Sequence, residues 1–196
     1  VSTFINRMKL LSGPQYYELL REFHINTGKT ESEATRLAGS NTLDTDWFGL
    51  TSRNARYDNV NLSLSGGKGN DTYYLSMGYR NQQNASPGNG LKQYTSSMRY
   101  YNQFSDKLQM TTTISPTLMQ REGLDQFANA AYMPPNINPY KEDGTYSTFL
   151  GLVNPVAALA ENTDKALAFT GTARIELQYA LLPFLSLRGA IGGNML

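Results

Sequence analysis

The sequence predicts an all-β fold of antiparallel strands preceded by a short helical segment. From Val60 onward, apolar and polar residues alternate with the two-residue period of a strand that has one apolar and one polar face. Turn-forming residues separate these alternating runs, whereas the residues before Val60 follow a helical spacing. Six runs show the strand period: 60–65, 73–80, 94–102, 108–115, 169–179 and 185–192.

The first 59 residues are expected to form a loop region with short helices. Pro14–Phe23 has helical spacing of its apolar residues, and Thr30–Ala38 continues with acidic residues near its start. Trp47, the single tryptophan, follows a polar, turn-rich segment. We expect it to anchor that segment onto its neighbours rather than to contact a ligand.

The connections between the predicted strands alternate between short and long. Gly66–Asp71, Phe104–Lys107 and Ala180–Pro183 are short, whereas Asn81–Lys92 and Met119–Leu167 are long. This asymmetry is typical of outer-membrane β-barrels, which have tight periplasmic turns and long extracellular loops. Strands of about ten residues at ~3.3 Å each, tilted by ~45°, also cover the ~25 Å apolar band of such a barrel.

The two faces of the predicted strands favour a membrane barrel over a soluble β-domain. One face carries charged residues: Arg80, Arg99, Arg174, Glu176 and Arg188. The other face has tyrosines near strand ends, as an aromatic girdle requires: Tyr73, Tyr79, Tyr100 and Tyr179. A soluble sheet also has a polar and an apolar face, so a soluble β-domain stays open as the alternative.

Composition excludes several classes of function. With 17 Lys+Arg against 16 Asp+Glu, the net charge is +1 and no basic run suggests a nucleic-acid partner. The absence of cysteine removes thiol nucleophiles and Cys-based zinc sites, and His24 is the single histidine. No apolar run approaches the ~20 residues of a membrane-spanning helix. We therefore expect no catalytic residue, no metal site and no cofactor.

The long connection 119–167 is the predicted binding segment. A connection of this length exceeds the ~12–15 residues above which a loop usually has a function. Flat aromatic rings beside amides suit sugar rings and their hydroxyls. The alternative is that these residues pack the loop on itself or against a partner subunit. The candidate residues are Tyr132, Asn138, Tyr140 and Tyr146, beside the further amides of Asn136 and Asn154.

Several segments resemble one family in order and spacing. NVNLSLSGG at 59–67, followed by TYYLSMGY at 72–79, resembles the early barrel of the SusC/RagA-type TonB-dependent transporters. Trp47 stands upstream where that family usually has a tryptophan. The segments 94–102, 131–146, 154–156 and 169–187 resemble the parts that follow. The Asn-, Gln- and Pro-rich segment 82–90 departs from the acidic, Gly-containing loop common in the family.

The resemblance implies a fragment of a large transmembrane β-barrel. Residues 1–59 would be the first extracellular loop region, and 60–196 about six of on the order of 22 strands. The chain starts without methionine and stops within an expected strand, so we expect an internal piece of a longer exported protein.

The family takes up nutrient oligosaccharides or peptides across the outer membrane of Bacteroidota. The resemblance therefore implies outer-membrane lipid as surroundings and a SusD-like surface lipoprotein as partner. Energy would come from TonB, acting through a plug region that has no counterpart in this chain. A soluble carbohydrate-binding β-module and a passive porin-type barrel are the alternatives.

Overall fold

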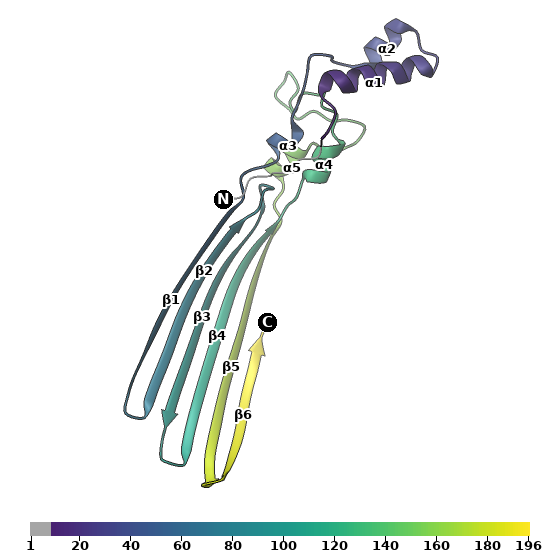
Figure 1. Cartoon of the computed structure of the whole chain (residues 1–196). Coiled ribbons are helices and arrows are strands. Elements are labelled where there is room, and N and C mark those ends of the chain that lie inside the picture. Colours follow the sequence, from purple (N-terminus) through teal and green to yellow (C-terminus); the bar gives the residue numbers. More distant parts are fainter. Residues whose placement is uncertain (1–8) are drawn as a thin grey trace. The chain divides into compact units, whose positions relative to one another are not determined.

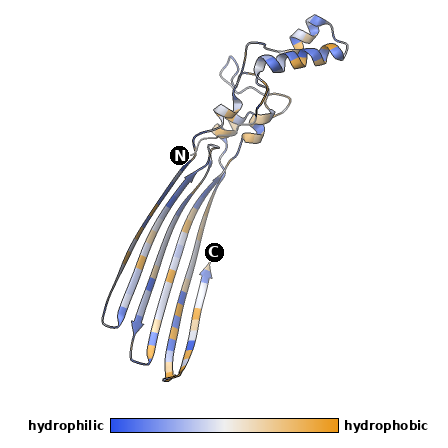
Figure 2. Ribbon diagram, viewed as in Figure 1, coloured by the Kyte–Doolittle hydropathy of each residue, from blue (hydrophilic) through white to orange (hydrophobic). Residues whose placement is uncertain are grey.

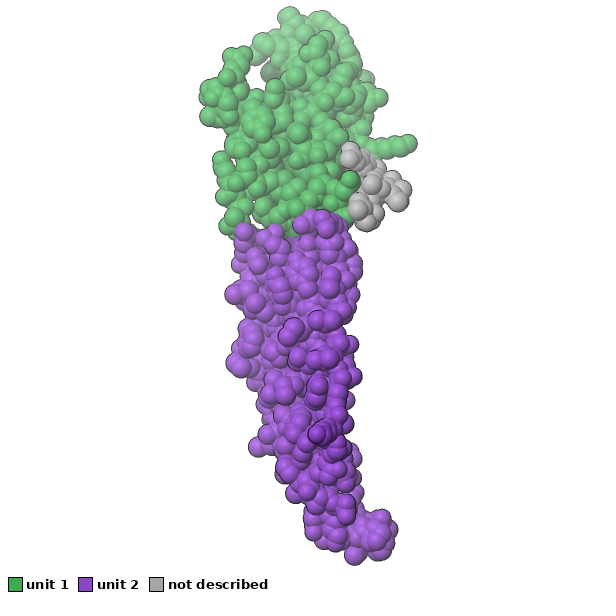
Figure 3. Space-filling view, turned by 90° about the vertical axis from the view of Figure 1, so that its left-hand side faces the viewer, with its two compact units in different colours: residues 1–55, 84–89, 123–164 green, residues 56–83, 90–122, 165–196 purple. Residues whose placement is uncertain are grey.

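The structure, a computed structural model, describes residues 9–196, which divide into two compact units (Figure 3). Unit 1 gathers the segments 9–55, 84–89 and 123–164. Unit 2 comprises 56–83, 90–122 and 165–196, and it contains the β-sheet. Each unit is thus assembled from segments that lie far apart in the sequence.

Unit 2 is a sheet of six strands in which neighbours along the chain are also hydrogen-bonded neighbours (Figure 1). The order β1-β2-β3-β4-β5-β6 is that of an antiparallel meander, which confirms the predicted strands and their number. The strands are β1 (Arg56–Lys68), β2 (Asp71–Gln83), β3 (Asn89–Gln103), β4 (Leu108–Gly123), β5 (Lys165–Leu182) and β6 (Leu185–Met195).

The three short turns are confirmed, but the strands reach further into the first and the third than predicted. Lys68 pairs with Asp71, so the first turn is Gly69-Asn70, with Gly69 at φ +61° where a side chain would be strained. The second turn is 104–107, as expected. The third is Pro183-Phe184, and a register shift between Ala180 and Leu182 precedes it.

The prediction of a long connection at Asn81–Lys92 is wrong. Asn81 pairs with Lys92 and Gln83 with Gly90, which leaves 84–88 as the connection. Asn and Gln are common in loops, but the hydrogen bonds between strands are made by backbone N–H and C=O groups. These residues supply such groups as well as any other. Arg53 caps the turn, because its guanidinium donates to the Asn84 carbonyl at 3.0 Å and the Asn89 carbonyl at 3.2 Å.

The connection predicted at 119–167 is shorter at both ends. β4 continues to Gly123 and β5 begins at Lys165, so the connection covers 124–164. The polar end of β4 is held by its partner strand, with Glu122 paired to Lys165 and their charged atoms 3.8 Å apart. Within the connection lie two short helices, α4 (Phe127–Tyr132) and α5 (Pro155–Glu161).

The helices of unit 1 begin at the capping residues that the sequence supplies. α1 (Gly13–Asn26) starts with a capping box between Ser12 and Gln15, and α2 (Glu31–Ala38) with one between Thr30 and Glu33. Both confirm the predicted helices. A further single turn, α3 (Trp47–Leu50), is capped by Asp46, whose carboxylate accepts the Gly49 amide at 2.8 Å.

The small core of unit 1 forms around Trp47. Its side chain is 2% exposed and packs with Ala130 of α4 and Met133. The indole Nε1 donates to the Pro134 carbonyl at 2.9 Å. The prediction that Trp47 is a packing anchor is confirmed. Partly buried apolar residues surround this cluster: Phe48, Ile137, Phe149, Leu152 and Val156.

Candidate functional site

One face of the sheet is apolar across all six strands, and we call it the apolar face. Residues directly opposite each other in the register share a face. Polar and apolar residues alternate along each strand (Figure 2). Leu62, at the middle of β1, is 70% exposed on this face. Paired residues that define the apolar face are Leu62 with Met77, Leu75 with Met98, Met110 with Leu177, and Ile175 with Ile191.

Tyrosines lie near both ends of the strands on the apolar face. Tyr73 pairs with Tyr100 toward the end with the short turns. Tyr79 pairs with Tyr94 toward the opposite end, with ring centroids 5.1 Å apart. This confirms the predicted placement of tyrosines, which is that of an aromatic girdle.

The opposite face, the polar face, carries the charged residues as predicted. Glu176 lies between two arginines: Arg174 Nη2 is 2.8 Å and Arg188 Nε 3.3 Å from its carboxylate oxygens. β3 and β4 are joined on this face by the Ser97 and Ser115 hydroxyls, 3.1 Å apart. The arginines, the glutamate and many Ser, Thr and Gln side chains therefore share one surface.

A hollow of about 730 Å³ lies on the polar face, and we call it the polar hollow. Gly192, directly opposite Arg174, lines it without a side chain. Arg99 also lines it and has no carboxylate partner among residues 9–196. This part of the sheet thus carries three arginines, Arg99, Arg174 and Arg188, and one glutamate, Glu176. Sequence reasoning missed the hollow, since the pairing of distant strands creates it. Its polar lining is Arg99, Tyr101, Thr111, Thr113, Thr172, Arg174, Glu176 and Asn194.

Three of the four predicted binding residues lie together in a small hairpin of unit 1. Tyr140 and Tyr146 form a β-bridge, with ring centroids 5.4 Å apart and planes tilted by 34°. Asn138 supports the hairpin, because its Oδ1 accepts the Tyr140 amide at 3.1 Å. The fourth, Tyr132, is 70% exposed at the end of α4. No hydrogen bond or ring contact joins Tyr132 to the hairpin within the described part of the chain.

The other two amides of this connection are structural. Asn154 is 4% exposed, and its Nδ2 donates to the carbonyls of Pro139 and Ser147, each at 2.9 Å. Its Oδ1 caps α5 by accepting the Val156 amide at 2.9 Å. Asn136 is also buried and donates to the Ala38 carbonyl at 2.8 Å. These side chains hold the loop together and are not free to bind a ligand.

The hairpin tip depends on a carboxylate. Asp143 Oδ1 accepts the Thr145 hydroxyl at 2.6 Å and the Thr145 amide at 2.9 Å. These bonds, the hydroxyl's first, hold the pKa of the Asp143 carboxyl below its ordinary value. Gly144, at φ +78°, closes the turn.

We expect the tip to keep its order from pH 7 to pH 5. A carboxyl whose pKa is lowered by folding stabilises the folded tip at pH values above its unfolded pKa of about 3.9. This stabilisation is lost as the pH falls through the lower pKa of the folded state. Hydrogen exchange at the Thr145 amide, corrected for its intrinsic pH dependence, should therefore rise only in strong acid. From pH 5 to pH 7 Asp143→Ala should raise it, whereas Glu142→Gln should not, since no hydrogen bond to Glu142 is found among residues 9–196. Equal exchange in the two variants would contradict this role of Asp143.

Two further kinds of feature are absent from residues 9–196. No group of three or more His, Asp or Glu side chains is placed to hold a metal ion in this range. No helix in this range has both the length and the hydropathy to cross a membrane.

Two curated relatives come from Formosa agariphila. TonB-dependent receptor P26 is 32% identical over 126 residues, and TonB-dependent receptor P39 is 24% identical over 139 residues. The matches cover 61% and 69% of this chain, but only 13% of each relative. No family model matches the chain.

Solved structures share the fold. The chain resembles the RagAB peptide transporter with a TM-score of 0.75 at 17% identity, over 93% of this chain and 25% of that one. The closed-closed state of the RagAB peptide importer gives 0.71 at 16% identity, over 94% and 25%. The chain is therefore similar in sequence to proteins named TonB-dependent receptors and in fold to the RagAB transporter.

The six-stranded sheet and the likeness to the RagAB structures confirm the predicted fold class of antiparallel strands from a partial β-barrel, with short helices before them. The chain spans a quarter of the solved transporter and about an eighth of the curated relatives.

Proposed function

We propose that the chain is part of a SusC-like barrel that takes up nutrient oligosaccharides or peptides across the outer membrane. In this proposal TonB supplies the energy through a plug region outside this chain, and a SusD-like lipoprotein is the partner. Residues 1–59 would be the first extracellular loop region and 60–196 the partial barrel. The whole protein would be a transporter and not an enzyme.

The two-faced sheet is the observation that supports the proposal most. Its apolar face offers Leu, Met and Ile side chains ringed by tyrosines, which suits contact with hydrocarbon. Its polar face carries arginines, which suit a wet barrel interior and would be costly toward lipid. The similarity to proteins named TonB-dependent receptors also supports the proposal of a transport barrel.

The hairpin with Tyr140 and Tyr146 is our candidate contact for the substrate. Tyr140 is nearly half exposed, and the buried amide of Asn154 fixes the hairpin that carries it. A rigid, partly exposed aromatic pair can stack on a sugar ring or on a peptide side chain. Asn138 and Tyr132 would add polar and aromatic contacts from the same connection.

We expect Tyr140→Ala to weaken substrate binding by about two- to twelvefold, as the loss of one aromatic contact of ~0.5–1.5 kcal/mol implies. Tyr140→Phe is the matched control, since it keeps the ring and should keep most of the affinity. The measurement is uptake of labelled neutral oligosaccharides and short peptides by cells that make the full-length protein, with and without TonB.

The same experiment separates the competing functions. Uptake that persists without TonB would favour a passive porin-type barrel. Recovery of the protein in the soluble fraction, with binding but no transport, would favour a carbohydrate-binding module. Equal uptake by Tyr140→Ala and Tyr140→Phe cells would show that the hairpin does not belong to the substrate site.

A further inference from the structure

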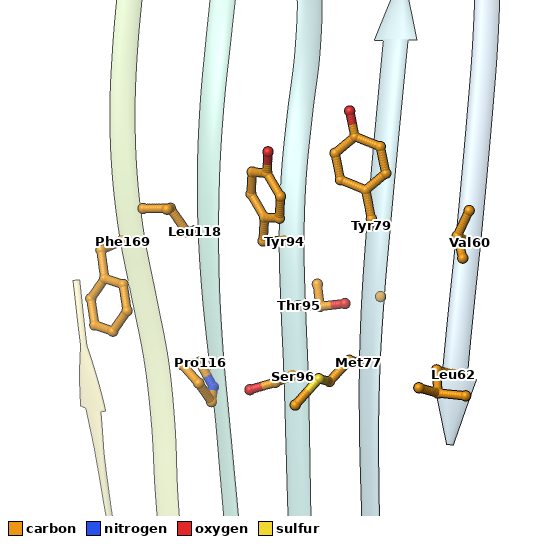
Figure 4. A pocket seen from close by; sticks show the side chains of 11 residues that line it. Val60, Leu62, Met77, Tyr79, Tyr94, Thr95, Ser96, Pro116, Leu118 and Phe169 are labelled. Atoms are coloured by element: carbon orange, nitrogen blue, oxygen red, sulfur yellow. The ribbon is translucent and has the colours of Figure 1, made fainter. Parts of the chain in front are cut away.

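The apolar face is not evenly filled, and a hollow of about 450 Å³ lies within it (Figure 4). We call it the apolar hollow. Strands β1 to β5 all contribute to its lining, and the lining carries no charged side chain. Residues that line it include Leu62, Met77, Ser96, Pro116, Leu118 and Phe169.

Small residues create the apolar hollow. Ser96 lies directly opposite Met77, and Pro116 directly opposite Gly171. Gly171 has no side chain, and the nearest atoms to a Cβ built there, on Phe169 and Pro116, are at 3.9 Å. The side chains are therefore short or absent at Ser96, Pro116 and Gly171, whereas Leu62 and Phe169 project from β1 and β5. The result is a depression bordered by bulky apolar groups.

One end of the apolar hollow is marked by two phenols. Tyr79 and Tyr94 lie side by side, and both hydroxyls point toward the end of the sheet at which β2 finishes (Figure 4). Neither hydroxyl has a hydrogen-bond partner within residues 9–196. The depression is thus hydrocarbon-like along its floor and offers two hydrogen-bond donors at one end.

We propose that the apolar hollow binds one acyl chain of a bilayer lipid, with the ester group near the hydroxyls of Tyr79 and Tyr94. The floor provides apolar contact for the chain, and the phenols donate to the carbonyl at the level where hydrocarbon gives way to headgroups. The proposal rests on the proposed membrane location of the sheet, and it adds a specific lipid site to it.

A second copy of the chain fits the apolar hollow less well. Lipid tails are as apolar as leucine, so two apolar protein faces gain no hydrophobic free energy by leaving lipid for each other. Association of copies would need close packing of projecting groups or interchain hydrogen bonds, and this surface is a depression. An acyl chain can adapt to such a shape.

The test is retention of lipid by the full-length protein. The full-length protein is reconstituted in dipalmitoyl phosphatidylethanolamine and extracted into mild detergent. Native mass spectrometry then measures how many lipid molecules each protomer retains. We expect one retained lipid per protomer in the natural protein and its loss in Ser96→Leu, which fills the hollow. Thr112→Leu is the matched control, because Thr112 lies on the apolar face opposite Ile175 but outside the hollow.

A second variant covers a failure of Ser96→Leu to fold. Tyr79→Phe with Tyr94→Phe keeps both rings, removes both hydroxyls, and should lower the retained fraction severalfold under the same wash. Equal retention in all variants, or retention of protein dimers without lipid, would overturn the lipid site. Natural protein that forms no heat-modifiable barrel in the bilayer would instead overturn the proposed membrane location.

Discussion

Replacing Leu62 with arginine is expected to destabilise the membrane-inserted protein by about 2–4 kcal/mol, the cost of this charge at the midplane of the lipid face of a barrel. Leu62 is the central residue of β1, lies opposite Met77 and is 70% exposed on the apolar face. In the proposed orientation its side chain would point into hydrocarbon, where a guanidinium loses its hydration without a partner.

Ser63→Arg is the matched control for Leu62→Arg. Ser63 is the next residue of β1 and lies opposite Ser76 on the polar face, which already carries arginines. The same charge at the same depth should therefore cost much less. The measurement is urea unfolding of the full-length protein in lipid vesicles, followed by heat-modifiable migration. Equal destabilisation by the two arginines would contradict the assignment of the faces.

The faces of the sheet could be predicted from the sequence because a strand period is a local property. Successive side chains of β1 and β2 lie on opposite faces of the sheet, as the alternation of apolar and polar residues predicts. This alternation does not depend on which strand is the partner. The presence of a turn within Gly66–Asp71 and of the two N-terminal helices is likewise local, since Lys68 pairs with Asp71 and each capping box joins residues three positions apart. Local rules suffice for such features.

The extent of the strands could not be predicted, because it depends on distant partners. Asn81 and Gln83 have loop-like side chains, yet they pair with Lys92 and Gly90. Glu122 at the end of β4 is held by Lys165, which belongs to a strand that begins beyond the long connection. Such polar residues extend a strand only where another backbone is already in register.

The candidate site shows the same division between local and distant information. Tyr140 and Tyr146 flank a turn, so their proximity follows from Asp143 and Gly144 between them. The burial of Asn154 follows from carbonyls of Pro139 and Ser147, which its own sequence neighbourhood does not reveal. An amide in a loop can serve a ligand or the loop itself, and only the fold distinguishes them.

Replacing Trp47 with alanine is expected to open unit 1 locally. Truncating a buried large aromatic costs about 3–5 kcal/mol, and here it also leaves the Pro134 carbonyl without its donor. Trp47 belongs to α3 but packs on Ala130 of α4 and on Met133. The loss should therefore appear in 124–164, far along the chain from the substitution.

Hydrogen exchange of the full-length protein tests this expectation. In Trp47→Ala, protection of the α4 amides should fall by roughly two to four orders of magnitude, since each 1.4 kcal/mol is tenfold. Trp47→Phe keeps most of the packing and should lose less. Leu50→Ala is the control, because Leu50 lies on the same helical turn but is half exposed. Unchanged α4 protection in Trp47→Ala would show that this connection is ordered by contacts other than the indole.

If α4 loosens as expected, substrate binding through Tyr140 should weaken as well, because Met133 of the Trp47 cluster and the base of the hairpin share one short stretch of chain.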